Sequence, residues 1–277
     1  MAAIALALAS SLTWGVADFS GGLLSRRLPL AGVTIISQAA GFVLLLAVLA
    51  ARGHVDLRSL WLGAIGGIGG GAGLACFYGA LARGTMSIVS PITACSAVVP
   101  LGLALGTGDR PPALALGGSA VALAGAVLAS VEERTAGDAG RRDAIVLAVG
   151  AALAIGCFVF FLGKGAHHGS VLSALVGARI GSLTLLVVWA TVTGRAVRVA
   201  PRATVPLAFI GLADMTANAL FALASQRGLL AVVSVLGSLF PIVTVLLAHL
   251  LLHERITTVQ RAGVVVALVG VAVVSAA

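Results

Sequence analysis

The chain has 277 residues, of which 60% are hydrophobic and only 9% are charged. A soluble domain carries about 25% charged residues, so this composition excludes a soluble globular protein and predicts a membrane protein. The net charge of +8 does not predict nucleic-acid binding. The basic residues stand singly or in small groups between apolar segments, which is typical of membrane boundaries and not of a basic face that binds nucleic acid.

Ten apolar segments of about 20 residues follow one another along the chain, each long enough to cross a hydrocarbon core of about 30 Å as a helix. We therefore predict an all-α membrane protein with ten transmembrane helices. The first segment is interpreted as a helix and not as a signal peptide, because no basic stretch precedes it and its pattern recurs internally. The predicted helices cover residues 3–24, 30–51, 60–82, 85–106, 112–131, 144–164, 170–192, 204–226, 229–252 and 257–276.

Glycines recur four residues apart in the third segment. Rows of small residues let helix backbones approach closely inside a membrane. We interpret the rows as helix-packing faces, with a bend beside a substrate path as the alternative. The rows are Gly63, Gly67 and Gly71, then Gly66 with Gly70, and Gly69 with Gly73.

The two halves of the chain resemble each other. Residues 3–7 recur as 144–148, the pair Arg83-Gly84 recurs as Arg227-Gly228, and Gly118–Gly125 recurs as Gly263–Gly270, at offsets of 141, 144 and 145 residues. Five helices per half is an odd number, so the second half must enter the membrane in the opposite sense. This predicts an inverted repeat, an architecture of many secondary transporters. The predicted domains are a first repeat over 1–131, a polar linker over 132–143 and a second repeat over 144–277.

Four short motifs add a family resemblance that covers essentially the whole chain. They are Trp14-Gly15 in the first helix, the run Gly108 to Pro111, its counterpart His253-Glu254-Arg255, and Ser238-Leu239-Phe240-Pro241 in the ninth helix. With the five-plus-five repeat, the chain resembles the EamA-type family of the drug/metabolite transporter superfamily. The resemblance implies ten helices around a central cavity and transport, often export, of amino acids, other small metabolites or drugs across a cytoplasmic membrane. It implies no cofactor and no chemical reaction.

Two opposite charges fall at similar membrane depth in adjacent helices. Arg179 lies roughly 14 Å into the seventh helix and Asp214 roughly 15 Å into the eighth, at 1.5 Å per residue. A charge near the bilayer centre is unfavourable by about 2.5–3.5 kcal/mol, which a partner offsets in part. We therefore predict an Arg179–Asp214 pair or a shared water network. Its role is either to fix helix register or to contact a charged substrate.

Asp18 is the only carboxylate of the first helix. The small multidrug resistance relatives in this superfamily also keep an essential acid in their first helix, so the resemblance implies proton or cation coupling through Asp18. The alternative is a structural acid that Arg26 or Arg27 reaches from the helix end.

Four further residues are candidates for the substrate site. Gln38 occupies the place in the second helix that Arg179 holds in the seventh, and Asn218 lies one turn after Asp214 on the same face. Trp14 and Tyr78 are expected either to stack on a substrate at the cavity wall or to anchor the chain at the membrane interface.

Catalytic and metal-binding signatures are missing from the sequence. We find no HExxH, P-loop, GxSxG or Gly-rich dinucleotide turn, and the three cysteines lie in apolar segments without metal-ligand spacing. We predict no enzyme activity, no cofactor and no metal. The expected partners are a small-molecule substrate and the lipid bilayer, with the protein as monomer or homodimer. An enzyme acting on lipid-linked substrates and a non-transporting membrane partner or sensor remain alternatives.

The orientation signals conflict. Loops that follow odd-numbered helices, with the helix ends beside them, carry eleven Lys or Arg residues and the other side carries five, which favours both termini outside. The family resemblance implies both termini inside. We follow the resemblance and predict a multi-pass protein of the cytoplasmic (inner) membrane with cytoplasmic termini.

Overall fold

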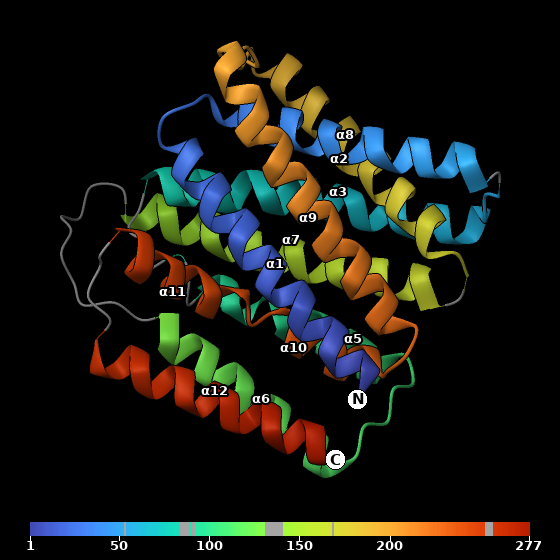
Figure 1. Ribbon diagram of the computed structural model, residues 1–277, viewed down its shortest axis with the longest axis vertical. Coiled ribbons are helices and arrows are strands. Elements are labelled where there is room, and N and C mark those ends of the chain that lie inside the picture. The colour runs from blue at the N-terminus through green and yellow to red at the C-terminus, as the bar shows by residue number, and fades with distance from the viewer. Residues whose placement is uncertain (53, 84–88, 90–91, 131–140, 168, 253–256) are drawn as a thin grey trace.

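The structure is a computed structural model that describes all residues except 53, 84–88, 90–91, 131–140, 168 and 253–256. Every regular element of the described part is a helix (Figure 1). Eight helical segments of this part are long and apolar enough to cross a membrane, and the apolar helices Ile92–Gly106 and Ala113–Ala129 are shorter. The chain is therefore an all-α, multi-pass membrane protein, as its composition predicts.

The helices follow the predicted segments closely. Where the structure describes them, the observed ends lie within three residues of the predicted ones, except in the fourth and ninth segments. The predicted linker and the run His253-Glu254-Arg255 lie wholly or mostly outside the described residues. The elements are α1 (Ala2–Ser25), α2 (Leu30–Arg52), α3 (Leu57–Arg83), η1 (Cys95–Ala97), α5 (Val98–Gly106), α6 (Ala113–Ser130), α7 (Arg141–His167), α8 (Val171–Val192), η2 (Pro201–Ala203), α9 (Thr204–Ser225), α10 (Leu230–Gly237), α11 (Phe240–Leu252) and α12 (Thr258–Ala276).

The ninth predicted segment, 229–252, corresponds to one candidate span, Leu230–Leu251, but the helix in it is interrupted. α10 ends at Gly237, and α11 begins at Phe240 after a turn through Ser238. Pro241 explains the break, because proline lacks a backbone N–H and its ring collides with the carbonyl four residues earlier, here that of Gly237. At the second position of a new helix the missing N–H leaves no bond unmade.

Glycine rows bring α3 against two helices of the second half. Gly63 and Gly67 face α8, where a Cβ on either would collide with the carbonyl oxygen of Ala174 or Ala178. Gly69 and Gly70 face α7, where added Cβ atoms would meet Ala154 and Phe158. The rows are therefore packing faces, as their spacing predicts, and α3 packs between α7 and α8.

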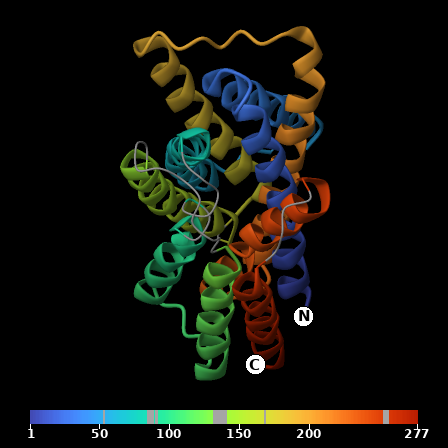
Figure 2. The same cartoon turned by 90° about the vertical axis from the view of Figure 1, so that its left-hand side faces the viewer.

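α6 and α12 form a pair at one end of the molecule, side by side in both views (Figures 1 and 2). Gly118 lies against Val274, whereas Gly125, two turns later, lies against Ala267. The partner number falls as the glycine number rises, so the two helices run antiparallel. Their backbones come close enough that a Cβ on Gly125 would collide with the Ala267 backbone.

Aspartate side chains form hydrogen bonds at the ends of two helices. Gly108 has φ +113°, a backbone conformation that favours glycine, and the Asp109 carboxylate that follows accepts a hydrogen bond from Ala231 N–H in the first turn of α10, at 3.0 Å. At the start of α3, the Asp56 carboxylate accepts hydrogen bonds from the Ser59 N–H, at 3.1 Å, and from the Ser59 hydroxyl. These bonds favour the ionised carboxylate and lower the pKa of Asp56 below its usual value.

Candidate functional site

A central cavity lies among helices from both halves of the chain. Its walls come from α1, α2 and α3 with η1 and α5 of the first half, and from α7 to α11 of the second. No described residue of α6 or α12 lines it. The cavity contains about 860 Å³ of empty space, its open mouth included. The first four helical segments of each half therefore build the site, and the α6–α12 pair lies outside it.

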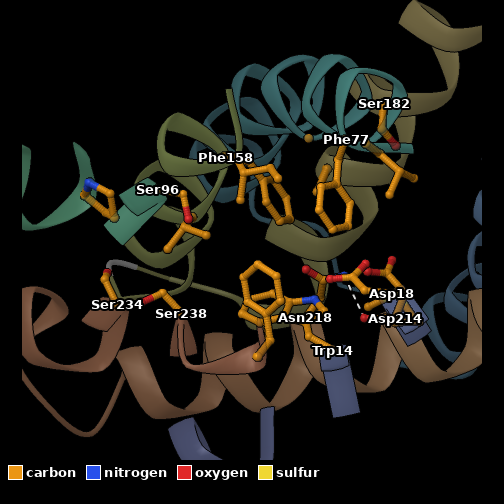
Figure 3. Close-up of a pocket in the computed structure, with 18 of the residues that line it drawn as sticks. Trp14, Asp18, Phe77, Ser96, Phe158, Ser182, Asp214, Asn218, Ser234 and Ser238 are labelled. Carbon is orange, nitrogen blue, oxygen red and sulfur yellow. Dashed lines mark hydrogen bonds between the residues drawn. The ribbon is translucent and has the colours of Figure 1, made fainter. Parts of the chain in front are cut away.

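The cavity has two polar ends with an aromatic middle (Figure 3). At one end lie the carboxylates of Asp18 and Asp214. Aromatic rings of Trp14, Phe77 and Phe158 form the walls between the ends. The opposite end carries the hydroxyl groups of Ser96, Ser234 and Ser238.

The charged end contains the predicted ion pair. Nη2 of Arg179 on α8 lies 2.6 Å from Oδ2 of Asp214 on α9. The Arg179 side chain is 6% exposed and that of Asp214 is 20% exposed. The prediction of a pair between these two residues is confirmed. Both residues also line the cavity, so the pair forms part of its wall.

Arg179 has a partner at each of its three nitrogens. Besides Asp214, its Nη1 donates to Oε1 of Gln38 on α2, and its Nε donates to the sulfur of Met215 at 3.5 Å. The Ser182 hydroxyl donates to the same Gln38 oxygen at 3.1 Å. Gln38 therefore occupies the predicted position opposite Arg179, and the network joins α2, α8 and α9. A guanidinium held at each nitrogen is oriented before any substrate arrives.

Asp18 lies beside this network but is not held by it. It lines the cavity, and its carboxylate and that of Asp214 repel each other electrostatically. Among the described residues nothing forms a hydrogen bond or an ion pair with Asp18. Arg26 and Arg27 are exposed beyond the end of α1, so the predicted alternative of a structural acid paired with them is wrong.

Asn218 and Trp14 also face the cavity. The Asn218 Nδ2 donates to the backbone carbonyl of Asp214 at 2.7 Å, one turn earlier. Its Oδ1 is buried and has no hydrogen-bond partner in the described part of the protein. Trp14 packs on Phe221 with the ring centroids 5.6 Å apart, which fixes the indole at the cavity wall.

Tyr78 does not lie on the cavity wall predicted for it. It is 2% exposed, belongs to the core with Phe77 and Leu81, and places its hydroxyl against Gly21 of α1. Burial between helices also removes it from the membrane interface, the alternative position. The reason is helix rotation: Phe77, one residue earlier, points into the cavity in its place.

Several lining residues were not predicted from the sequence. Phe77 shares a helix face with Gly70 and Leu74, at i, i+4 and i+7, and all three line the cavity. This spacing from a glycine row is the signal that would have found Phe77. No comparable signal marks the serines. Among the described residues, no group of three or more His, Cys, Asp or Glu lies close enough together to hold a metal ion.

Apolar helices of membrane-spanning length around a central cavity with charged residues are typical of integral membrane proteins, to which many secondary transporters belong. A sequence model of the EamA-like transporter family matches residues 1–131 and 143–276. The chain therefore belongs to the EamA-like transporter family, within the drug/metabolite transporter superfamily, which confirms the resemblance seen in the sequence. Members of this family are generally transporters of small substrates.

A solved structure, described only as the crystal structure of a protein, is similar along nearly the whole chain. The match covers 99% of this chain and 96% of the other, with a TM-score of 0.77 and 16% sequence identity. At this identity the likeness shows the fold alone. No curated protein matches the sequence.

Proposed function

We propose that this protein is a secondary transporter that exports small metabolites, amino acids or drugs across the cytoplasmic membrane by alternating access. The observation that carries the proposal is the cavity itself. Its charged end lies within apolar helices of membrane-spanning length from both halves of the chain, where a buried charge network is otherwise unfavourable. A site shared by two halves can be exposed to either side of a membrane in turn.

An inverted repeat over 1–131 and 144–277, with a linker over 132–143, is part of the proposal. Support comes from contacts that recur when the halves are exchanged. Gly67 of α3 packs on the carbonyl of Ala178 in α8, and Gly211 of α9 packs on the carbonyl of Ser37 in α2. Gly211 lies 144 residues after Gly67, and Ala178 lies 141 residues after Ser37, the offsets found in the sequence.

A second pair of contacts obeys the same exchange. Gly15 of α1 faces Val243 of α11, and Gly156 of α7 faces Val99 of α5. The offsets are again 141 and 144 residues. The antiparallel pairing of α6 with α12, the last helix of each half, supports opposite orientation of the two halves.

Within this site we assign roles to the lining residues. Asp18 is proposed to carry proton or cation coupling, because it is a cavity carboxylate without a counter-charge in the described structure. Arg179, Asp214 and Gln38 form a preorganised wall, and Asn218 and Trp14 contact the substrate. Tyr78 supports α1 from behind the wall and is not proposed to contact it.

Orientation and assembly are also proposals. We place both termini in the cytoplasm, as the family resemblance implies, and propose a monomer or homodimer. The two termini lie near each other in both views (Figures 1 and 2), which is compatible with the proposal that both lie on one side of the membrane. Fluorescence of a C-terminal green fluorescent protein fusion tests the orientation, because this reporter folds in the cytoplasm and not after export across the membrane.

Metabolite profiling of cells and medium, with and without the protein, tests the function. We expect one class of compounds to rise in the medium when the protein is produced, and purified protein in liposomes to move that class. A chemically altered lipid-linked compound instead would favour a membrane enzyme. Unchanged profiles together with inactive liposomes would favour a non-transporting partner and overturn the proposal.

A further inference from the structure

The charges on the cavity wall do not balance. The ionisable residues among the described lining residues are Asp18, Arg179 and Asp214, two carboxylates and one guanidinium. Arg179 and Asp214 neutralise each other across 2.6 Å. One carboxylate, that of Asp18, is left without a counter-charge inside the cavity. The wall therefore favours a cationic ligand over an anionic one.

Arg179 already shares its charge with a carboxylate. Three of its five N–H groups donate to Gln38, Asp214 and Met215, which leaves one N–H on Nη1 and one on Nη2. A ligand carboxylate that bound these two groups would lie near the like charges of Asp214 and Asp18. This arrangement disfavours an amino acid, although one with its amine at Asp18 would still satisfy half of the site.

The side-chain amide of Asn218 offers a hydrogen-bond acceptor at the charged end. Asn218 has its amide orientation set, because Nδ2 must face the Asp214 carbonyl that it bonds. Its buried Oδ1 is then an acceptor without a partner in the described structure. A carboxylate and an amide oxygen are both acceptors, and an ammonium group carries three donors and no acceptor.

The space next to the charged end is aromatic. Figure 3 shows Trp14 on one wall and Phe77 and Phe158 on the other, between the charged and the hydroxyl ends. Such walls accept the flat apolar body of a ligand, and aromatic pairs add attraction beyond buried area. At the far end, the Ser234 hydroxyl is buried without a partner in the described residues.

We infer that the cavity binds aromatic primary amines that lack a carboxylate, with the ammonium group at Asp18 and Asn218 and the ring between Trp14 and Phe77. The inference rests on the proposed function and narrows its substrate class. It ranks an amine above the amino acid of the same skeleton, and both above the corresponding acid.

Three ligands of one skeleton test this ranking on the wild-type protein. Binding of radiolabelled 2-phenylethylamine to purified protein in nanodiscs is measured, with unlabelled 2-phenylethylamine, phenylalanine and 3-phenylpropanoate as competitors. We expect the amine to compete at a concentration at least about tenfold lower than phenylalanine, since juxtaposed like charges are strongly unfavourable, and 3-phenylpropanoate to compete least. Equal or tighter binding of phenylalanine, or no specific binding of the amine, overturns the inference.

A matched pair of variants locates the ammonium group. Asp18→Asn removes the carboxylate and is expected to weaken amine binding at least about tenfold, as loss of a partner for a buried charge does. Asp143→Asn removes an exposed carboxylate in the first turn of α7 and is expected to leave binding unchanged. Undiminished binding in Asp18→Asn overturns the assignment, and the ranking on wild-type protein decides the inference where that variant does not fold.

Transport in liposomes separates this inference from the proposed function. If the protein moves phenylalanine but does not bind the amine, the proposed transport function is supported and the inferred ligand class is overturned. If amine binding depends on Asp18 but the amine never crosses the bilayer, the inferred ligand class is supported and the proposed transport function is overturned.

Discussion

Arg179 on α8 and Asp214 on α9 are joined across 2.6 Å, and the same guanidinium donates to Gln38 on α2. One side chain thus links helices from both halves at the charged end of the cavity. Because each of its nitrogens has a partner, the guanidinium is held in place. This distinguishes Arg179 from Asp18, which faces the same cavity without such partners among the described residues.

Loss of either member of this pair is predicted to destabilise the protein. In Asp214→Leu the Arg179 charge stays buried without its partner, a penalty of about 2.5–3.5 kcal/mol for a charge at the middle of a membrane helix. We expect a lower unfolding temperature in detergent, and partial recovery in Arg179→Leu with Asp214→Leu, where no charge remains. A variant Asp214→Leu as stable as the wild type would contradict this.

A transport assay on Arg179→Leu tests a separate point. Transport at normal protein levels would rule out direct substrate contact by Arg179.

Adding a methyl group at Gly125, in the contact between α6 and α12, is predicted to destabilise the protein. In Gly125→Ala the new Cβ would collide with the Ala267 backbone, and overpacking of this kind destabilises by about 1–3 kcal/mol. Gly117→Ala on the same helix is the control, because a Cβ there meets nothing within 4 Å. Thermal unfolding of both variants checks the difference. Equal stability of the two would show that the helices do not pack as closely as described.

Asp18→Asn is predicted to remove the pH dependence of transport while the protein still folds. The titratable and charged groups near Asp18 are Asp214 with its partner Arg179, and Tyr78 on α3. Since Arg179 holds Asp214, we expect Asp18 to be the group that exchanges its proton during the cycle. Uptake into liposomes at a series of pH values measures this. A pH profile identical to that of the wild type would eliminate coupling through Asp18.

Asp56 is predicted to contribute stability only while it is ionised. Hydrogen bonds from Ser59 lower the pKa of the folded state from the ordinary value of 3.8. A group with a lowered pKa stabilises the fold above its unfolded pKa and loses that contribution as the pH falls through the folded pKa. The wild type should therefore unfold at a higher temperature than Asp56→Asn at pH 6, with the difference shrinking below about pH 3.8. A constant difference at all pH values would contradict this origin.

The helix boundaries could be predicted because few backbone structures are stable in the lipid bilayer. Backbone groups in hydrocarbon must bond within their own segment, so an apolar segment of sufficient length becomes a helix. The Arg179–Asp214 pair could be predicted for a related reason. Two opposite charges at equal depth in consecutive helices are each unfavourable alone, and pairing reduces that penalty. The break after Gly237 was missed, although Pro241 marks it.

The cavity wall was harder to predict, because these helices are apolar on nearly every side. An amphipathic pattern shows which face of a helix points inward, and a helix that is apolar all round carries no such pattern. Tyr78 and Phe77 show the consequence: the sequence favours the tyrosine, yet the phenylalanine lines the cavity. Asp18 shows it too, since the basic residues near it in the chain do not reach it in space.

The membrane environment, the extent of most helices and the positions of the buried charges along them could thus be predicted from the sequence, because these depend on local hydrophobicity and on distance along a helix. Which charges are neutralised, which carboxylate remains without a counter-charge in the described structure and which rings face the cavity became visible only in the folded protein. Those outcomes depend on how each helix is rotated about its axis, and glycine contacts between distant segments set that rotation.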